Sequence, residues 1–155
     1  MNKLFTLQKK CIRIVSCKTT KINYQFQHTK PMFANLKVLT VFNLFTYFTA
    51  VESMKVLRSD APKAIVKNFT ISTITSRLIF PKCKLEATKS RSFIYNGSKI
   101  LNYLLDNDIP YPAIISEQVF KARLKSHLLF SQSQSRTGDV EWLPCNHSIF
   151  SYIRL

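Results

Sequence analysis

The chain has 155 residues, 46% of them hydrophobic, and its 23 Lys and Arg side chains against 8 Asp and Glu give a formal net charge of +15. This length suits one domain that buries roughly 70% of its unfolded surface. The sequence contains only two glycines, and it holds no Gly-rich phosphate loop, dinucleotide fingerprint or nucleophile elbow, which argues against those enzyme classes.

The first element predicted is a helix over residues 3–17. Leu4, Leu7, Cys11 and Ile14 follow a 3-4-3 spacing that places them on one face of this helix. Residues 18–30 are polar and are expected to form a loop.

A second helix is expected to begin near Pro31, with Thr29 as its N-cap, and to run to about Arg58 with a possible break over residues 36–40. Within it, residues 38–51 form the most apolar stretch of the chain. As a helix these residues would extend about 21 Å, short of the ~30 Å hydrocarbon core, so we expect a buried helix and no membrane span.

The second half of the chain has weaker patterns. Residues 71–75 are rich in β-branched side chains and are expected to be extended or loop. Residues 92–95 are predicted to form a short strand, Asn96-Gly97 a turn, and residues 98–105 a short helix with Ile100, Leu101, Leu104 and Leu105 buried.

The last predicted element is a helix from Glu117 to Phe130, with Ser116 as N-cap and a stripe of Phe120, Leu124 and Leu128. A Ser- and Gln-rich stretch then predicts the start of a flexible tail at 131–155. The expected fold is mainly α and irregular, with one short β element and long loops. An alternative left open is that it is incomplete as an isolated domain.

Metal-dependent chemistry on nucleic acids needs carboxylates that converge on a cation. No two acidic residues are adjacent, and the nearest pairs are Asp106 with Asp108 and Asp139 with Glu141. The four cysteines form no C-x-x-C pair, so a zinc site is not indicated, and a nucleophilic pair of Cys145 and His147 lacks an orienting partner. We therefore expect no catalytic residues, no metal and no cofactor.

Positive charge is concentrated in two blocks. Residues 1–40 hold eight cations and no acid, and residues 61–100 hold eight cations against Glu86 alone. Such blocks favour a polyanionic partner, RNA or DNA, over the alternatives of a solvated basic face or an anionic membrane surface. Cations interleaved with aromatics form one candidate patch, which comprises Arg91, Phe93, Tyr95, Lys99 and Tyr103. The residues expected to contact phosphates are Lys9, Lys10 and Arg13, then Arg91 and Lys99.

Several motifs follow one another over about residues 7–130. They are Leu7-Gln8-Lys9-Lys10-Cys11-Ile12-Arg13-Ile14-Val15, the stretch His28-Thr29-Lys30-Pro31-Met32-Phe33-Ala34-Asn35-Leu36-Lys37-Val38-Leu39, the short elements Thr75-Ser76-Arg77 and Pro81-Lys82-Cys83-Lys84, the segment Ser92-Phe93-Ile94-Tyr95-Asn96-Gly97-Ser98-Lys99-Ile100-Leu101-Asn102-Tyr103-Leu104 and the helix Phe120-Lys121-Ala122-Arg123-Leu124-Lys125-Ser126-His127-Leu128-Leu129. In this order they resemble the C-terminal region of non-LTR (LINE-type, jockey-like) retrotransposon reverse transcriptases, downstream of the polymerase palm.

The resemblance implies a helical region that supports the polymerase and contacts its RNA or the primed DNA. The paired aspartates that the family carries upstream are missing here, Leu101 stands where the family often has Trp, and residues 131–155 match nothing in it. The expected function is thus a non-catalytic fragment that binds RNA or DNA through its basic surface.

Two other functions stay open. One is a protein-interaction module that docks through the apolar helix 38–51, and the other is a pseudogene product that does not fold. The compartment is also undecided: nucleus or cytoplasm fits better than secretion, and the acid-free first 51 residues also suit a mitochondrial presequence.

Overall fold

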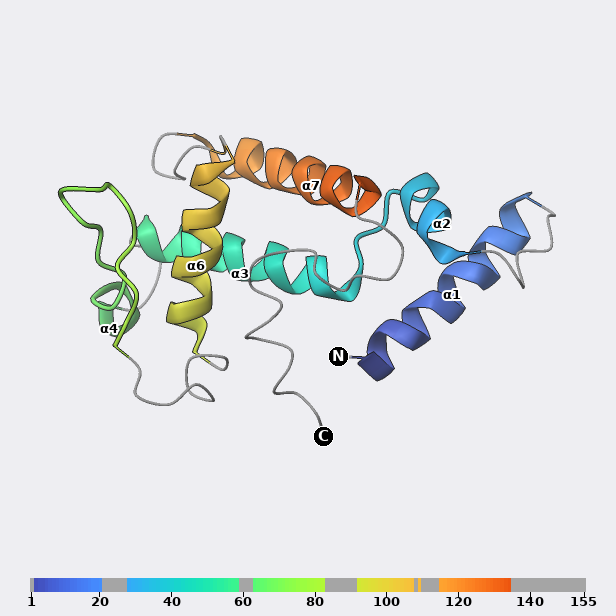
Figure 1. Cartoon of the computed structure of the whole chain (residues 1–155), viewed down its shortest axis with the longest axis horizontal. Coiled ribbons are helices and arrows are strands. Elements are labelled where there is room, and N and C mark those ends of the chain that lie inside the picture. The colour runs from blue at the N-terminus through green and yellow to red at the C-terminus, as the bar shows by residue number, and fades with distance from the viewer. Residues whose placement is uncertain are drawn as a thin grey trace.

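The computed structural model of the chain describes residues 2–20, 28–58, 63–82, 92–107, 109 and 115–134. These residues form helices α1 (Asn2–Thr20), α2 (Thr29–Asn35), α3 (Val41–Leu57), α4 (Lys63–Val66), α6 (Phe93–Asp106) and α7 (Glu117–Gln134). The prediction of a mainly helical fold is confirmed. Figure 1 shows α3 lying along the middle, with α7 beside it and α6 across it, while α1 and α2 lie at the opposite end from α4.

The second predicted helix is indeed broken over residues 36–40, between α2 and α3. The N-cap of α2 is His28, whose Nδ1 accepts a hydrogen bond from the Lys30 amide, so the prediction of Thr29 is wrong by one residue. Pro31 stands in the first turn, as predicted, where a missing N–H removes no helical bond. Thr29 is the first residue of α2, and its side chain is buried.

The end of α2 is set by backbone hydrogen bonds. The Lys37 amide donates to the Ala34 carbonyl, and the Val38 amide donates to the Phe33 carbonyl, each at 3.1 Å. This pair of bonds is the Schellman arrangement, and it requires a left-handed residue at Lys37, where φ is 50°. The chain then extends to Thr40, whose hydroxyl caps α3 by accepting from the Asn43 amide.

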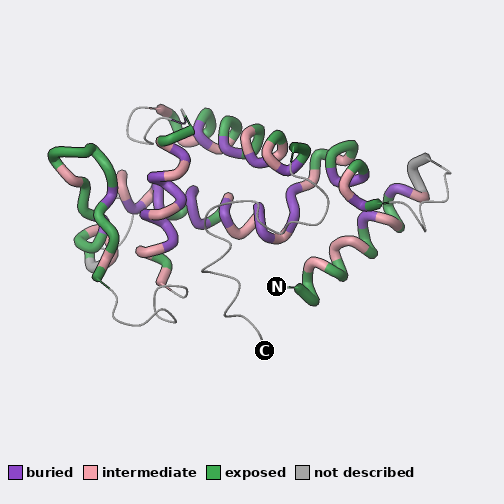
Figure 2. Tube along the Cα trace, in the orientation of Figure 1, coloured by how far each residue is buried: buried purple, intermediate pink, exposed green. Residues whose placement is uncertain are grey.

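The main core lies where α3, α6 and α7 meet. Its centre consists of Ala50 and Met54 of α3, Ile100 and Leu104 of α6, and Leu124 of α7, each with no more than 1% of its surface exposed. Figure 2 shows the buried residues concentrated along the facing sides of these helices. The predicted stripe of Phe120, Leu124 and Leu128 on α7 is confirmed, since all three are buried.

Residues 93–97 are helical, so the predicted strand at 92–95 and the turn at Asn96-Gly97 are wrong. Ser92 caps α6 by accepting a hydrogen bond from the Tyr95 amide at 3.2 Å. Gly97 lies inside α6, at the point where this helix crosses α3. A Cβ at Gly97 would collide with the Ser53 Oγ and lie 3.2 Å from the Ser53 Cβ. Glycine is therefore required for close helix approach and not for a turn.

A buried carboxamide of α6 binds the segment after α4. Ile71 and Leu78 form an isolated antiparallel bridge, in agreement with the expectation of extended or loop structure at 71–75. Asn102 of α6 accepts from the Leu78 amide and donates to the Leu78 carbonyl, both at 2.9 Å. Because Leu78 is buried, this pairing supplies the hydrogen bonds that a neighbouring strand would otherwise give.

Two glutamines hold the extended connection between α2 and α3 in the same way. Gln132 of α7 accepts from the Thr40 amide and donates to the Val38 carbonyl, both at 3.1 Å. Gln8 of α1 accepts from the Val41 amide and donates to the Leu39 carbonyl, both at 2.8 Å. The successive peptide groups of residues 38–41 are therefore satisfied from both sides by side chains from distant parts of the chain. We call this arrangement the glutamine clamp.

The position of Gln132 corrects a further expectation. The predicted helix ends at Phe130 and a flexible tail begins at Ser131, whereas α7 continues to Gln134 and Gln132 is only 3% exposed. The Ser and Gln residues looked like linker composition, but a buried carboxamide with backbone partners belongs to the packed structure. Residues 135–155 lie outside the described residues.

A smaller apolar cluster joins α1 and α2. Ile12 of α1 is buried against Met32 and Phe33 of α2, and Phe5 packs beside them and against Phe42 of α3, with ring centroids 5.2 Å apart. The stripe of Leu4, Leu7, Cys11 and Ile14 that the sequence groups on one face of α1 lies elsewhere and is exposed. Within the part of the chain that the structure describes, no helix is both long and apolar enough to cross a bilayer.

Candidate nucleic-acid interface

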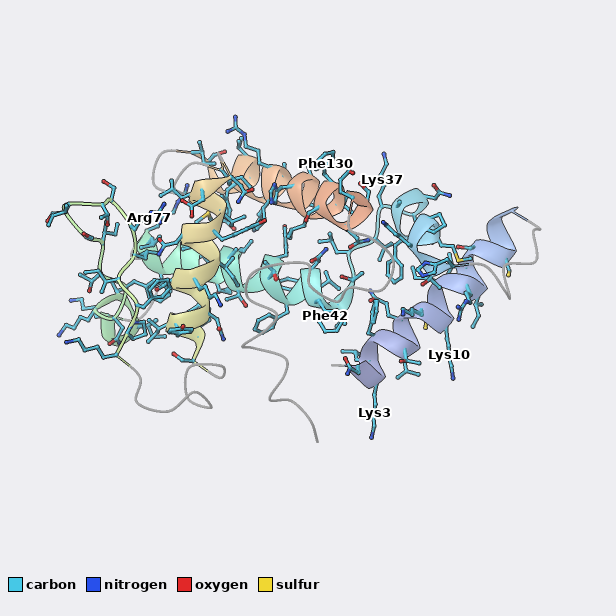
Figure 3. The ribbon with its side chains drawn as sticks, in the orientation of Figure 1. Lys3, Lys10, Lys37, Phe42, Arg77 and Phe130 are labelled. Atoms are coloured by element: carbon cyan, nitrogen blue, oxygen red, sulfur yellow. The ribbon has the colours of Figure 1, made fainter. Side chains whose placement is uncertain are left out.

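The cations of α1 occupy two different environments. Lys10 is exposed and, with Lys3, projects from the side of α1 that faces away from α3 (Figure 3). Lys9 is half-buried and its Nζ lies 4.3 Å from the centre of the Phe5 ring, which is a cation–π contact. Arg13 is also half-buried, and its Nε has no hydrogen-bond partner among the described residues. Of the three predicted phosphate contacts here, Lys10 is the most accessible.

The predicted patch at residues 91–103 does not form as expected, because its described residues lie on a helix and not on a strand. Phe93 and Tyr95 would share one face of a strand, but in a helix they are separated by about 200°. Phe93 accordingly packs near Phe69, with ring centroids 5.9 Å apart, while Tyr95 packs near Phe80 at 5.5 Å. Arg91 lies outside the described residues.

A different grouping results from the helical period. Tyr95, Lys99 and Tyr103 are spaced by four residues, so they form one half-buried stripe along α6. Phe80 extends this stripe at one end, and at the other the rings of Tyr103 and His127 of α7 lie 6.3 Å apart. We call these five residues the aromatic stripe. The participation of Phe80 and His127 was not predicted, because neither is near the stripe in sequence.

The two predicted groups of cations do not form one continuous site. Lys9, Lys10 and Arg13 lie on α1, whereas Lys99 lies on α6, and the two helices occupy different ends of the molecule in Figure 1. A nucleic acid that touched both groups would have to pass along the body of the protein. The arrangement suits several weak phosphate contacts spread along a strand better than one enclosed pocket.

Few carboxylates offset this positive charge among the residues that the structure describes. In the described part of the chain the acidic side chains are Glu52, Asp106 and Glu117, and each forms an ion pair. The partners are Lys55, at 2.8 Å, Arg77 and Lys121 respectively. The hydrogen bond from Lys121 holds the pKa of Glu117 below its usual value, and the hydrogen bond to Glu52 raises the pKa of Lys55. Many exposed cations thus have no described carboxylate to neutralise them.

The described side chains do not assemble a metal site. No three His, Cys, Asp or Glu residues among them lie close enough to hold a metal ion. Asp106 is exposed and paired with Arg77. Cys11 and Cys17 are free thiols. The other acids and nucleophiles considered from the sequence lie outside the described residues; they are Asp108, Asp139, Glu141, Cys145 and His147.

The apolar helix proposed for partner docking is the centre of the fold. Phe42, Thr46, Ala50 and Val51 of α3 are buried. The polar stripe of this helix is buried too: Asn43 donates to the Gln132 side chain at 3.0 Å, and Thr46 donates to the Phe42 carbonyl at 3.3 Å. Docking through α3 would therefore be limited to its exposed side, where Phe48 lies.

Comparison with known proteins gave no match: no protein-family model, no curated protein and no solved structure is similar to this chain.

Proposed function

We propose that this chain is a non-catalytic nucleic-acid-binding protein that holds RNA or DNA through its phosphates, in the manner expected of the reverse-transcriptase tail that its motifs resemble. The observation that carries the proposal is the charge balance. The full sequence has a net charge of +15, and the described carboxylates are already ion-paired. A surface of this kind gains free energy by releasing the counterions condensed on a polyanion.

The aromatic stripe supports a preference for unpaired bases. Tyr95 and Tyr103 are half-buried, so part of each residue remains accessible, and Lys99 lies one turn from both. An aromatic ring that stacks on an unpaired base contributes roughly 1–3 kcal/mol, and a neighbouring cation binds the adjacent phosphate. Paired bases in a duplex cannot stack in this way, so single strands are the expected ligand for α6.

The test is fluorescence anisotropy of the full chain with a 20-nucleotide RNA, the matching single-stranded DNA and the duplex, from 50 to 200 mM salt. We expect the logarithm of the association constant to fall linearly with the logarithm of salt, with a slope of roughly −0.7 to −0.9 for each phosphate contact. Changing Lys9, Lys10 and Arg13 together to alanine should weaken all three ligands and flatten the slope. Changing Lys9 and Lys10 to arginine, which keeps the charge, should neither weaken binding nor flatten the slope.

Replacing Tyr95 and Tyr103 with alanine should weaken binding of the single strands by roughly tenfold or more and leave the duplex nearly unchanged. An affinity that does not depend on salt would refute phosphate-led binding. Primer extension or strand cleavage by the purified chain, free of contaminating enzymes, would refute the non-catalytic assignment.

A further inference from the structure

The exposed face of α1 carries an apolar stripe that the fold leaves uncovered. Leu4, Leu7 and Ile14 keep 53%, 57% and 59% of their surface exposed, and Cys11 between them is exposed as well. These are large values for aliphatic side chains in a helix that already packs another face inward. Their 3-4-3 spacing is that of the a and d positions of a heptad, which recur on helices that pack against another helix.

The first part of this stripe, from Leu4 to Cys11, forms one wall of a groove. Leu4, Leu7, Gln8 and Cys11 of α1 face Val41 and Leu44 of α3 across a volume of about 360 Å³. The lining is almost entirely apolar, because the Gln8 carboxamide is already bonded to the backbone of residues 39 and 41. A nucleic acid has no apolar ridge to place in such a groove. The side chains of an amphipathic helix do.

The border of the stripe determines the charge of the occupant. Lys3 and Lys10 are seven residues apart, hence on the same side, and both project away from α3 along the outer edge of the stripe (Figure 3). In the heptad they hold g positions, which pair across the interface with charged residues of the partner helix. A second copy would bring another acid-free α1 against this one, since residues 1–40 contain eight cations and no acid. That pairing is repulsive.

We infer that the groove between α1 and α3 binds an amphipathic helix of another protein whose apolar stripe is bordered by Glu or Asp. The apolar ridge of the partner fills the space between Leu4, Leu7, Val41 and Leu44, and its carboxylates meet Lys3 and Lys10. This interaction shares Lys10 with the proposed nucleic-acid binding, but it also depends on apolar side chains that contribute nothing to phosphate contacts. Substitution of those apolar side chains therefore distinguishes the two.

The probe is a fluorescein-labelled synthetic peptide of three heptads, with Leu at a and d, Glu at e and g, and Ala or Gln elsewhere. A second peptide with Lys at e and g serves as its control. At 150 mM salt the full chain should bind the Glu peptide at least about tenfold more tightly than the Lys peptide. Changing Leu7 and Ile14 to serine should weaken the Glu peptide at least tenfold while leaving oligonucleotide affinity and thermal stability unchanged.

Charge reversal gives the sharper result. Lys3→Glu with Lys10→Glu should reverse the preference between the two peptides. Arg123→Glu with Lys125→Glu, which makes the same change of net charge at exposed positions of α7, should not. Equal reversal by both pairs, or retention of Glu-peptide binding by the serine variant, would overturn the inference.

Two other occupants would also overturn it. A concentration-dependent dimer in sedimentation velocity, with a Cys11–Cys11 disulfide forming on mild oxidation, would assign the groove to a second copy. Binding of phosphatidylserine vesicles that the Leu7 and Ile14 changes abolish, without binding of the Glu peptide, would assign it to an anionic lipid surface.

Discussion

Replacing Gln132 with alanine tests the glutamine clamp and, with it, the extent of the folded chain. The carboxamide of Gln132 is 3% exposed and makes hydrogen bonds of 3.1, 3.0 and 3.1 Å with the Thr40 amide, the Asn43 side chain and the Val38 carbonyl. Alanine leaves the buried Thr40 amide and the Val38 carbonyl without these partners. Each unsatisfied group costs about 1–3 kcal/mol, so we expect a loss of about 3 kcal/mol.

The measurement is thermal and urea denaturation followed by circular dichroism. For a chain of this size the loss should lower Tm by roughly 6–12 °C, since 1 kcal/mol corresponds to roughly 2–4 °C. Gln134→Ala is the matched control, because Gln134 lies in the same helix, two residues away, and is exposed. It should change stability by less than about 0.5 kcal/mol.

Gln8 holds the same connection from the other side, so the two glutamines should be coupled. Once Gln132→Ala has loosened residues 38–41, Gln8→Ala should cost less than it does in the wild-type chain. Equal stability of the Gln132→Ala and Gln134→Ala variants would refute the clamp. A wild-type chain without any cooperative transition would instead support the pseudogene alternative.

Three further predictions concern single positions. Gly97→Ala should destabilise the chain by about 2 kcal/mol in urea denaturation because α6 is pressed against Ser53, and a Ser53→Ala background should recover part of this loss; full additivity of the two changes would contradict the contact. Burial lowers the pKa of His127 from its ordinary 6.5, so the unfolded chain takes up a proton first as pH falls. The free energy of unfolding should thus be greatest above pH 6.5 and decrease as pH falls toward the folded-state pKa, and His127→Asn should reduce this decrease. If urea titrations give the wild-type chain and the His127→Asn variant the same change in unfolding free energy between pH 7.5 and 5.5, this role is excluded. Lys37→Gly should raise Tm by relieving the left-handed φ of 50°, a gain of about 1 kcal/mol, whereas Lys37→Ala, which removes the same charge, should give no such gain.

The candidate site could be predicted only in part. The concentration of cations in residues 1–40 is evident from the sequence, and Lys10 among them is exposed. The α6 group could not be assembled from the sequence, because Phe93 and Tyr95 alternate like strand residues. Ser92 at the N-cap and the continuous run to Asp106 make them helical and bring Tyr95, Lys99 and Tyr103 together instead.

The features that could be predicted without the fold are those set by local interactions. The helical class and the buried stripe of α7 follow from periodicity, and the break over residues 36–40 was expected. The predicted cap at Ser116 is confirmed, because its hydroxyl accepts from the Val119 amide. Thr40, which was not predicted as a cap, caps α3 in the same way. These bonds join residues three apart, so the order of amino acids is enough to indicate them.

Which side of each helix is covered depends on how the helices pack together. On α1 both faces are apolar, and the fold buries Ile12 and partly covers Phe5 while leaving Leu7 and Ile14 in solvent. At the other end of the chain, Gln132 is buried by peptide groups 92 and 94 residues earlier in the sequence. Burial and hydrogen-bond satisfaction depend on such distant partners, and no local pattern in a single sequence encodes them.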